Sequence, residues 1–145
     1  MSGWLLDTNI VSALGPGKRT VPRETAAWFR ARTEALYLST ISVAEIEAGI
    51  AKLFRSGASH RAGLLRSWFD EILAGYADHL LSFDLSAARV AGALSDAALA
   101  VGRNPGFADI AIAGTAKANE LVVVTFNQRH FDPLGVEVVN SFAPH

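Results

Sequence analysis

The fold of this chain is decided by its first buried segment, Trp4-Leu5-Leu6-Asp7-Thr8-Asn9-Ile10-Val11-Ser12-Ala13-Leu14. The apolar run Trp4–Leu6 predicts a short buried strand, and a helical pattern from Ile10 to Leu14 follows it at once. Asp7 therefore stands at the carboxyl end of the first strand, and in an open parallel sheet such ends line the crevice where ligands bind. A carboxylate placed there costs free energy unless a metal, a cation or hydrogen bonds stabilise it. The segment thus predicts a strand and a site together.

Strand and helix patterns alternate along the rest of the chain. Further apolar runs typical of buried strands occur at Leu36–Leu38, Leu80–Phe83 and Leu121–Thr125, with a weaker run at Val136–Val139. Helical periodicity fills the intervals, at Pro22–Ala31, Ser42–Phe54, Arg61–Gly75, Leu85–Val101 and Phe107–Asn119. This alternation predicts an α/β fold, a three-layer α/β/α sandwich with a mainly parallel central sheet of four to five strands. We expect residues 1–145 to form a single domain.

Composition excludes several classes of protein. The net charge of -1 argues against a strongly basic protein that coats nucleic acid, although acidic catalytic groups can offset a local basic patch in a nuclease. The absence of cysteine removes disulfides, thiolate nucleophiles and cysteine-based zinc sites. No apolar run is long enough to span a bilayer and the N-terminus has no basic leader pattern, so we expect a cytoplasmic protein. Because half of the chain is hydrophobic, we also expect an interface with a partner or second subunit.

Three carboxylates occupy comparable positions relative to the predicted strands. Asp7 ends the first strand, Glu45 lies in the first turn of the helix after Leu36–Leu38, and Asp109 opens a helix that leads into Leu121–Thr125. Strand carboxyl ends and helix N-termini point to the same edge of a parallel sheet, so all three side chains are expected to converge there. Converged carboxylates repel one another unless hard cations separate them, and oxygen ligands of this kind suit Mg²⁺ or Mn²⁺. Such a metal can activate water and stabilise charge on a phosphodiester.

Each of these carboxylates also has a structural interpretation. Ser42-Val43-Ala44-Glu45 fits a capping box, in which Glu45 would bond back to the start of its own helix. Asp109 could complement the positive end of its helix dipole, and Asp7 could cap the short helix that follows it. The joint placement of all three on one edge favours a functional site.

Four motifs in order carry a resemblance to a known family: Leu6-Asp7-Thr8-Asn9, Ser42-Val43-Ala44-Glu45-Ile46, Ala108-Asp109-Ile110-Ala111-Ile112-Ala113 and Val124-Thr125-Phe126-Asn127. With these motifs the chain closely resembles a PIN domain and, more narrowly, a VapC-type toxin of a toxin–antitoxin pair in the FitB-like branch. The resemblance implies a Mg²⁺-dependent endoribonuclease, with Mn²⁺ as a substitute, that cleaves RNA phosphodiester bonds with metal-activated water. It also implies a homodimer that a VapB-type antitoxin inhibits, in a higher complex that contacts operator DNA through the antitoxin.

The resemblance also suggests which residues form the site. The acidic site of the family maps onto Asp7, Glu45 and Asp109, as metal ligands and catalytic groups. The hydroxyl and amide groups that support them map onto Thr8, Asn9 and Thr125, with Asn127 nearby.

The chain departs from the family at one point. Many relatives carry a further aspartate where Asn127 or His130 stands here. Because the site then has less negative charge, we expect one well-held Mg²⁺ and weaker binding of a second ion. The missing acid also supports an alternative function, a catalytically weak PIN domain that acts mainly as a binding partner and co-repressor with a DNA-binding antitoxin.

The weakest assignments concern the substrate. Arg103, in the loop before Asp109, is the best candidate for a phosphate contact. For His130 we weigh a phosphate contact or proton transfer against a loop residue that packs beside Phe131, and favour packing.

Two other enzyme classes do not fit the first motif. A haloacid-dehalogenase-like phosphatase would need an acid where Asn9 stands, and a dinucleotide-binding fold would need a glycine-rich turn after the first strand.

Overall fold

The central sheet has five strands, and the first strand lies in its middle. The computed structural model describes residues 2–17 and 21–139. Its strands are β1 (Trp4–Leu6), β2 (Leu36–Ser39), β3 (Leu80–Leu81), β4 (Val122–Val124) and β5 (Val138–Val139), in the order β3-β2-β1-β4-β5. Every described pair of strands is parallel, and Leu6 at the end of β1 aligns with Leu38 on one side and Val124 on the other. The chain builds one half of the sheet outward from β1 and then returns to add the other half, so β1 and β4 flank the point where strand order reverses.

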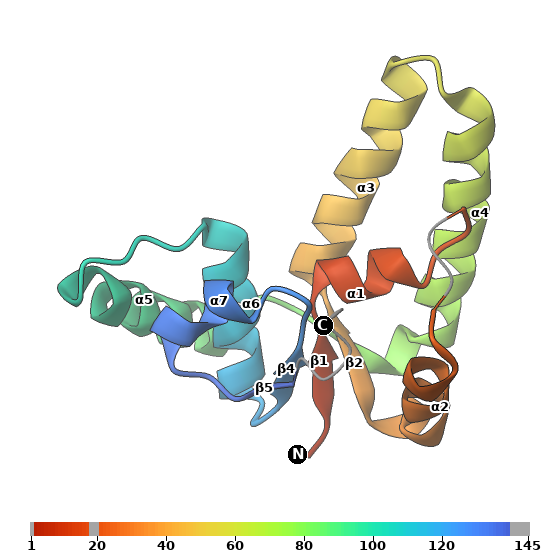
Figure 1. The fold of residues 1–145 in the computed structure, drawn as a ribbon. Helices are drawn as coiled ribbons and strands as arrows, with labels where there is room; N and C mark the ends of the chain where they lie inside the picture. The colour runs from red at the N-terminus through yellow and green to blue at the C-terminus, as the bar shows by residue number, and fades with distance from the viewer. Residues whose placement is uncertain (1, 18–20, 140–145) are drawn as a thin grey trace.

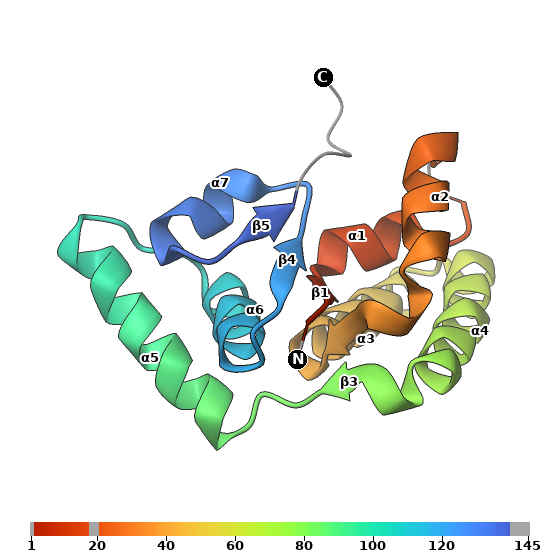
Figure 2. The same cartoon turned by 90° about the horizontal axis from the view of Figure 1, so that it is seen from below.

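Helices cover both faces of the sheet, as Figures 1 and 2 show. One layer holds α1 (Thr8–Ala13), α2 (Arg23–Ala31), α3 (Thr40–Arg55) and α4 (Ser59–Gly75), and the other holds α5 (Leu85–Ala100), α6 (Phe107–Ala118) and α7 (Gln128–Phe131). Short 3-10 turns at Thr33–Ala35, Ala77–His79 and Asp132–Leu134 complete the connections. The predicted α/β class, its three layers and its parallel sheet are confirmed.

Alternate residues of the central strands fill two separate cores. Leu5 and Val123 face the layer of α5, α6 and α7, whereas Leu6 and Val124 face the layer of α1 to α4. This is the period of two that a strand imposes on its side chains. Because both faces are buried, the strands read as continuous apolar runs rather than as alternating patterns.

Helix α6 packs against α5 at very short range. A Cβ atom added at Gly114 would lie 2.8 Å from the carbonyl oxygen of Ala87 and 2.8 Å from the Cβ of Ala91. Residues 110–116 of α6 are all buried. The small side chains at this contact therefore fix α6, which carries Asp109 in its first turn.

Several predicted boundaries differ from the structure by one or two residues, and hydrogen bonds explain two of these differences. The strand predicted at Leu80–Phe83 ends at Leu81, because the Phe83 amide donates to Thr40 Oγ1 (3.2 Å) and Asp84 caps α5 through the Ala87 amide (2.9 Å). The helix predicted to begin at Ser42 begins at Thr40, because Ser39 caps it by accepting from the Ser42 amide (3.1 Å).

Within residues 2–17 and 21–139, no helix has the length and apolar character needed to cross a bilayer.

Candidate active site

Asp7 lies at the carboxyl end of the central strand and both of its carboxyl oxygens are held. The residue is only 5% exposed. Its backbone amide continues the sheet by donating to the Val124 carbonyl (2.9 Å), and its side chain caps α1, with Oδ1 accepting from the Thr8 amide (2.8 Å). Oδ2 accepts from the Thr125 hydroxyl (2.7 Å). The structural interpretation of Asp7 as the cap of α1 is therefore confirmed, and its side chain lies at the predicted edge of the sheet.

Thr125 fixes this arrangement from the end of the neighbouring strand. Its hydroxyl is fully buried and accepts from the Asn127 amide (2.9 Å) and, at longer range, from Asn9 Nδ2 (3.3 Å). A hydroxyl has one proton and two lone pairs. Because both lone pairs have donors, the single proton of Thr125 is directed to Asp7 Oδ2.

Glu45 reaches the same edge through Thr8. The Thr8 hydroxyl donates to Glu45 Oε1 (2.6 Å) and lies 2.8 Å from the Ser42 hydroxyl oxygen, from which it can accept. The capping-box interpretation of Glu45 is wrong, since the cap is Ser39 and Glu45 stands in the second turn of α3. The sequence analysis gave Ser42 no part in the site. The spacing of three between Ser39 and Ser42 is the signal that could have identified Ser39 as the helix cap and Ser42 as the residue bonded to it.

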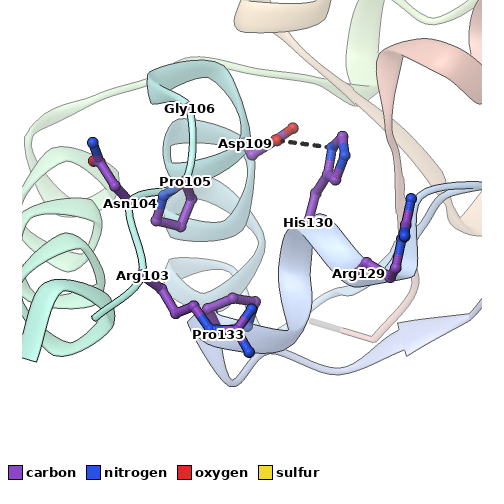
Figure 3. A pocket seen from close by; sticks show the side chains of 8 residues that line it. All are labelled: Arg103, Asn104, Pro105, Gly106, Asp109, Arg129, His130 and Pro133. Carbon is purple, nitrogen blue, oxygen red and sulfur yellow. Dashed lines mark ion pairs between the residues drawn. The ribbon is translucent and has the colours of Figure 1, made fainter. Parts of the chain in front are cut away.

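Asp109 enters the edge from the opposite layer. Helix α6 begins at Phe107, where the helical periodicity predicted its start, and its N-cap Gly106 has no side chain to offer. Asp109 Oδ2 lies 3.2 Å from Nδ1 of His130, which α7 carries (Figure 3). The favoured interpretation of His130 is wrong: Phe131 is fully buried, whereas the His130 side chain is 52% exposed and paired with Asp109.

The three carboxylates affect one another electrostatically. Burial raises the pKa of Asp7; hydrogen bonds from Thr125 and Thr8 oppose this shift, and the charges of Asp109 and Glu45 add to it. Burial also raises the pKa of Asp109, with His130 opposing the shift and Glu45 adding to it. Among the described residues, no lysine or arginine forms an ion pair with any of the three. The site thus concentrates negative charge that the described side chains compensate only through His130.

The donor set suits a hard cation, although the side chains as placed do not enclose one. Carboxylate and hydroxyl oxygens are the ligands that Mg²⁺ and Mn²⁺ prefer. In the part of the chain that the structure describes, no three acidic or histidine side chains are grouped closely enough to hold a metal ion. Glu45 is engaged by Thr8 and Asp109 by His130, so these two carboxylates share an edge with Asp7 but point to other partners.

Arg103 lies in the loop between α5 and α6, six positions before Asp109 in the sequence. It lines a pocket together with Asp109, Arg129 and His130. The sequence-predicted residues therefore fall into two neighbouring groups, an acidic edge around Asp7 and a pocket that begins at Asp109.

Comparisons with known proteins match nearly the whole chain. The family model described as PIN domain matches residues 4–135. VapC ribonuclease Y4jK of Sinorhizobium fredii is 35% identical over 142 residues, which cover 97% of this chain and 98% of the relative. Toxin FitB of Neisseria gonorrhoeae is 32% identical over 95% of this chain and 97% of its own length.

Solved structures show the same fold over nearly the whole chain. The crystal structure of FitAcB from Neisseria gonorrhoeae has a TM-score of 0.81 at 32% identity, covering 94% of this chain and 96% of that chain. DNA-bound VapBC from Salmonella typhimurium has a TM-score of 0.80 at 25% identity, covering 96% and 98%. With the family model matched over most of its length and curated relatives above 30% identity, this chain belongs to the PIN domain family.

Proposed function

We propose that this chain is a metal-dependent endoribonuclease and the toxin of a VapBC-type toxin–antitoxin pair. The observation that carries the proposal is the coupled set of Asp7, Glu45 and Asp109 at the carboxyl edge of the sheet. Similarity to a VapC ribonuclease supports this reaction class, and similarity to toxin FitB supports the toxin role. Buried carboxylates with perturbed pKa values and no lysine or arginine partner among the described residues are typical of catalytic sites rather than of structural ion pairs.

The residues present fit a divalent cation. Asp7 and Asp109 would bind Mg²⁺ or Mn²⁺ directly, and Glu45 would complete the ligand set directly or through water. When bound, the cation would lower the pKa of a water molecule and offset charge on the phosphodiester. Because Thr8 joins Asp7 to Glu45, a rotation of Glu45 toward the cation requires release of the Thr8 hydroxyl.

The remaining residues hold these carboxylates in position. Thr125 orients Asp7, and Asn9 and Asn127 in turn orient Thr125. Supporting groups of this kind fix ligand geometry at metal sites. Glu45 is the exposed member of the set and is placed to orient the attacking water, while His130 holds Asp109.

A groove beside the site supports the proposed antitoxin partner. It has a volume of about 290 Å³, lies between α1, α3 and α4, and is lined by apolar side chains that include Leu53, Leu65 and Trp68. Thr8 and Glu45 line it as well, so a segment seated there would reach the acidic edge. An amphipathic helix of an antitoxin suits such a groove. The homodimer implied by the family resemblance remains part of the same proposal.

Cleavage of single-stranded RNA by the purified protein tests the function. We expect cleavage with Mg²⁺ or Mn²⁺, none with EDTA, and loss of more than about a hundred-fold in Asp7→Asn, since even groups behind a ligand contribute ten- to a hundred-fold. Asp96→Asn is the matched control, because Asp96 is exposed on α5. An active Asp7→Asn protein would disprove the assignment. An inactive wild-type protein that still binds its antitoxin would favour the co-repressor alternative.

A further inference from the structure

A pocket next to the acidic edge has the opposite electrostatic character. It has a volume of about 320 Å³ and is formed by the loop before α6 and by α7, as Figure 3 shows. Its titratable and charged side chains are Arg103, Arg129, His130 and Asp109. Asp109 is the one acidic group among these lining residues, and His130 is paired with it. The pocket therefore presents two guanidinium groups beside a site that is otherwise acidic.

Neither arginine is engaged elsewhere in the described part of the chain. Arg103 and Arg129 are exposed, and no described carboxylate lies within ion-pair distance of either side chain. They come from separate segments, one at the end of α5 and one in α7. Two guanidinium groups without a described ion pair, both lining one pocket, favour an anionic ligand over a structural ion pair.

The backbone on both sides of the pocket is well anchored. Gly102 adopts φ +76° after α5, and the Arg103 amide donates to the Ala98 carbonyl (2.9 Å), which closes the helix end. On the other side, Phe131 is fully buried and ties α7 to the core next to Arg129. The two arginines are therefore carried by backbone that a hydrogen bond on one side and core packing on the other hold in place.

We propose that this pocket binds a backbone phosphate of the RNA strand, one that neighbours the phosphodiester being cut. The inference rests on the proposed nuclease function and adds a subsite to it. Arginine binds phosphate oxygens through paired, charge-assisted hydrogen bonds. Because Asp109 belongs to both the acidic edge and the pocket, a strand whose scissile phosphate lies at the edge places its next phosphates along the arginines. The basic pocket also offsets the repulsion between the carboxylates and the polyanionic substrate.

The test measures RNA binding separately from cleavage. A fluorescein-labelled single-stranded oligouridine is titrated with Asp7→Asn protein in EDTA, and binding is followed by anisotropy over a range of salt concentrations. Adding Arg103→Ala and Arg129→Ala should weaken binding about ten-fold and reduce the slope of log Kd against log salt by about 1.4, for two lost phosphate contacts on a single strand. The matched control, Arg23→Ala with Arg30→Ala on α2, removes the same charge from exposed positions away from the pocket and should change neither quantity.

Several outcomes would overturn the subsite. Unchanged binding in the pocket variant would do so, as would equal weakening in the α2 control, because the effect would then be one of net charge. Tighter binding of duplex DNA than of the oligouridine would assign the arginines to another ligand. In wild-type background, the pocket variant should raise KM for RNA about ten-fold while kcat changes little. If the wild-type protein binds through the pocket but cuts no RNA under any metal condition, the nuclease proposal fails together with the placement of the pocket beside a scissile phosphate, while phosphate binding by the two arginines stands.

Discussion

The buried hydroxyl of Thr125 gives the sharpest test of how the site is built. In Thr125→Val, a methyl group replaces the hydroxyl at nearly constant volume. Asp7 Oδ2 then loses its donor and the Asn127 amide loses its acceptor. In Thr125→Ser, both hydrogen bonds are retained and only a buried methyl group is lost.

The two substitutions should differ clearly in free energy. A hydrogen bond to a charged group contributes about 1.5–3 kcal/mol and an ordinary one about 0.5–1.5 kcal/mol, so Thr125→Val should lower the free energy of unfolding by about 2–4 kcal/mol at neutral pH. Loss of a buried methyl group in Thr125→Ser should cost about 1 kcal/mol. For a chain of this size, about 1 kcal/mol corresponds to a shift in Tm of roughly 2–4 °C.

Thermal unfolding in EDTA, followed by circular dichroism, measures both variants against the wild type. RNA cleavage is assayed in parallel at a temperature where all three proteins are folded. We expect Thr125→Ser to keep most of its activity and Thr125→Val to lose it, because Asp7 is no longer oriented.

Two results would refute this reasoning. A Thr125→Val protein as stable as the wild type would mean that the Asp7–Thr125 bond contributes nothing net to folding. Equal losses in the valine and serine variants would mean that packing of the methyl group, rather than the hydroxyl network, accounts for the effect.

Three further predictions follow from the same structure. Because burial raises the pKa of Asp7, this carboxyl group holds its proton more tightly in the folded protein than in the unfolded chain. The resulting contribution to the free energy of unfolding is present at low pH and is lost as pH rises through the raised pKa. Asp7→Asn in EDTA should therefore gain Tm relative to wild type as pH rises above the ordinary pKa of an aspartate, and a relative loss would contradict the burial argument. Gly114→Ala should destabilise the fold by about 1–3 kcal/mol in urea unfolding, because its methyl group meets α5, whereas Gly92→Ala, with open space around it, should be neutral or stabilising. Mn²⁺ at about a hundred times its Kd should stabilise the wild type by about 2.7 kcal/mol in thermal-shift assays and the Asp7→Asn variant far less; equal shifts would place the ion elsewhere.

Short-range features of the site were predictable from the sequence. An aspartate directly after an apolar run, before a helical pattern, placed Asp7 correctly at the end of a strand and as a helix cap. The strand runs were long enough in sequence to identify the sheet, although hydrogen bonds to Thr40 and Ser39 moved two element boundaries by one or two residues. Local propensity cannot decide which of two serines three residues apart caps the helix. In the structure β2 ends at Ser39, and Ser39 is the cap of α3.

Contacts between distant segments were not predictable in the same way. The Thr8–Glu45 bond spans 37 positions and the Thr125–Asp7 bond spans 118. The pairing of His130 with Asp109 depends on how α7 is oriented by the burial of Phe131, which no local pattern encodes. These long-range contacts determine which carboxylates are free to bind a ligand.

The tight contact between α5 and α6 has a consequence for sequence variation. With Gly114 lying against the Ala87 backbone and Ala91, the helix that supplies Asp109 leaves no space for a larger residue at that position. Asn127 and His130, by contrast, are exposed at the rim, where substitution meets little steric resistance. Homologous lineages should therefore diversify at the rim, where charge and substrate preference can change, while the α5–α6 contact stays restricted to glycine and alanine.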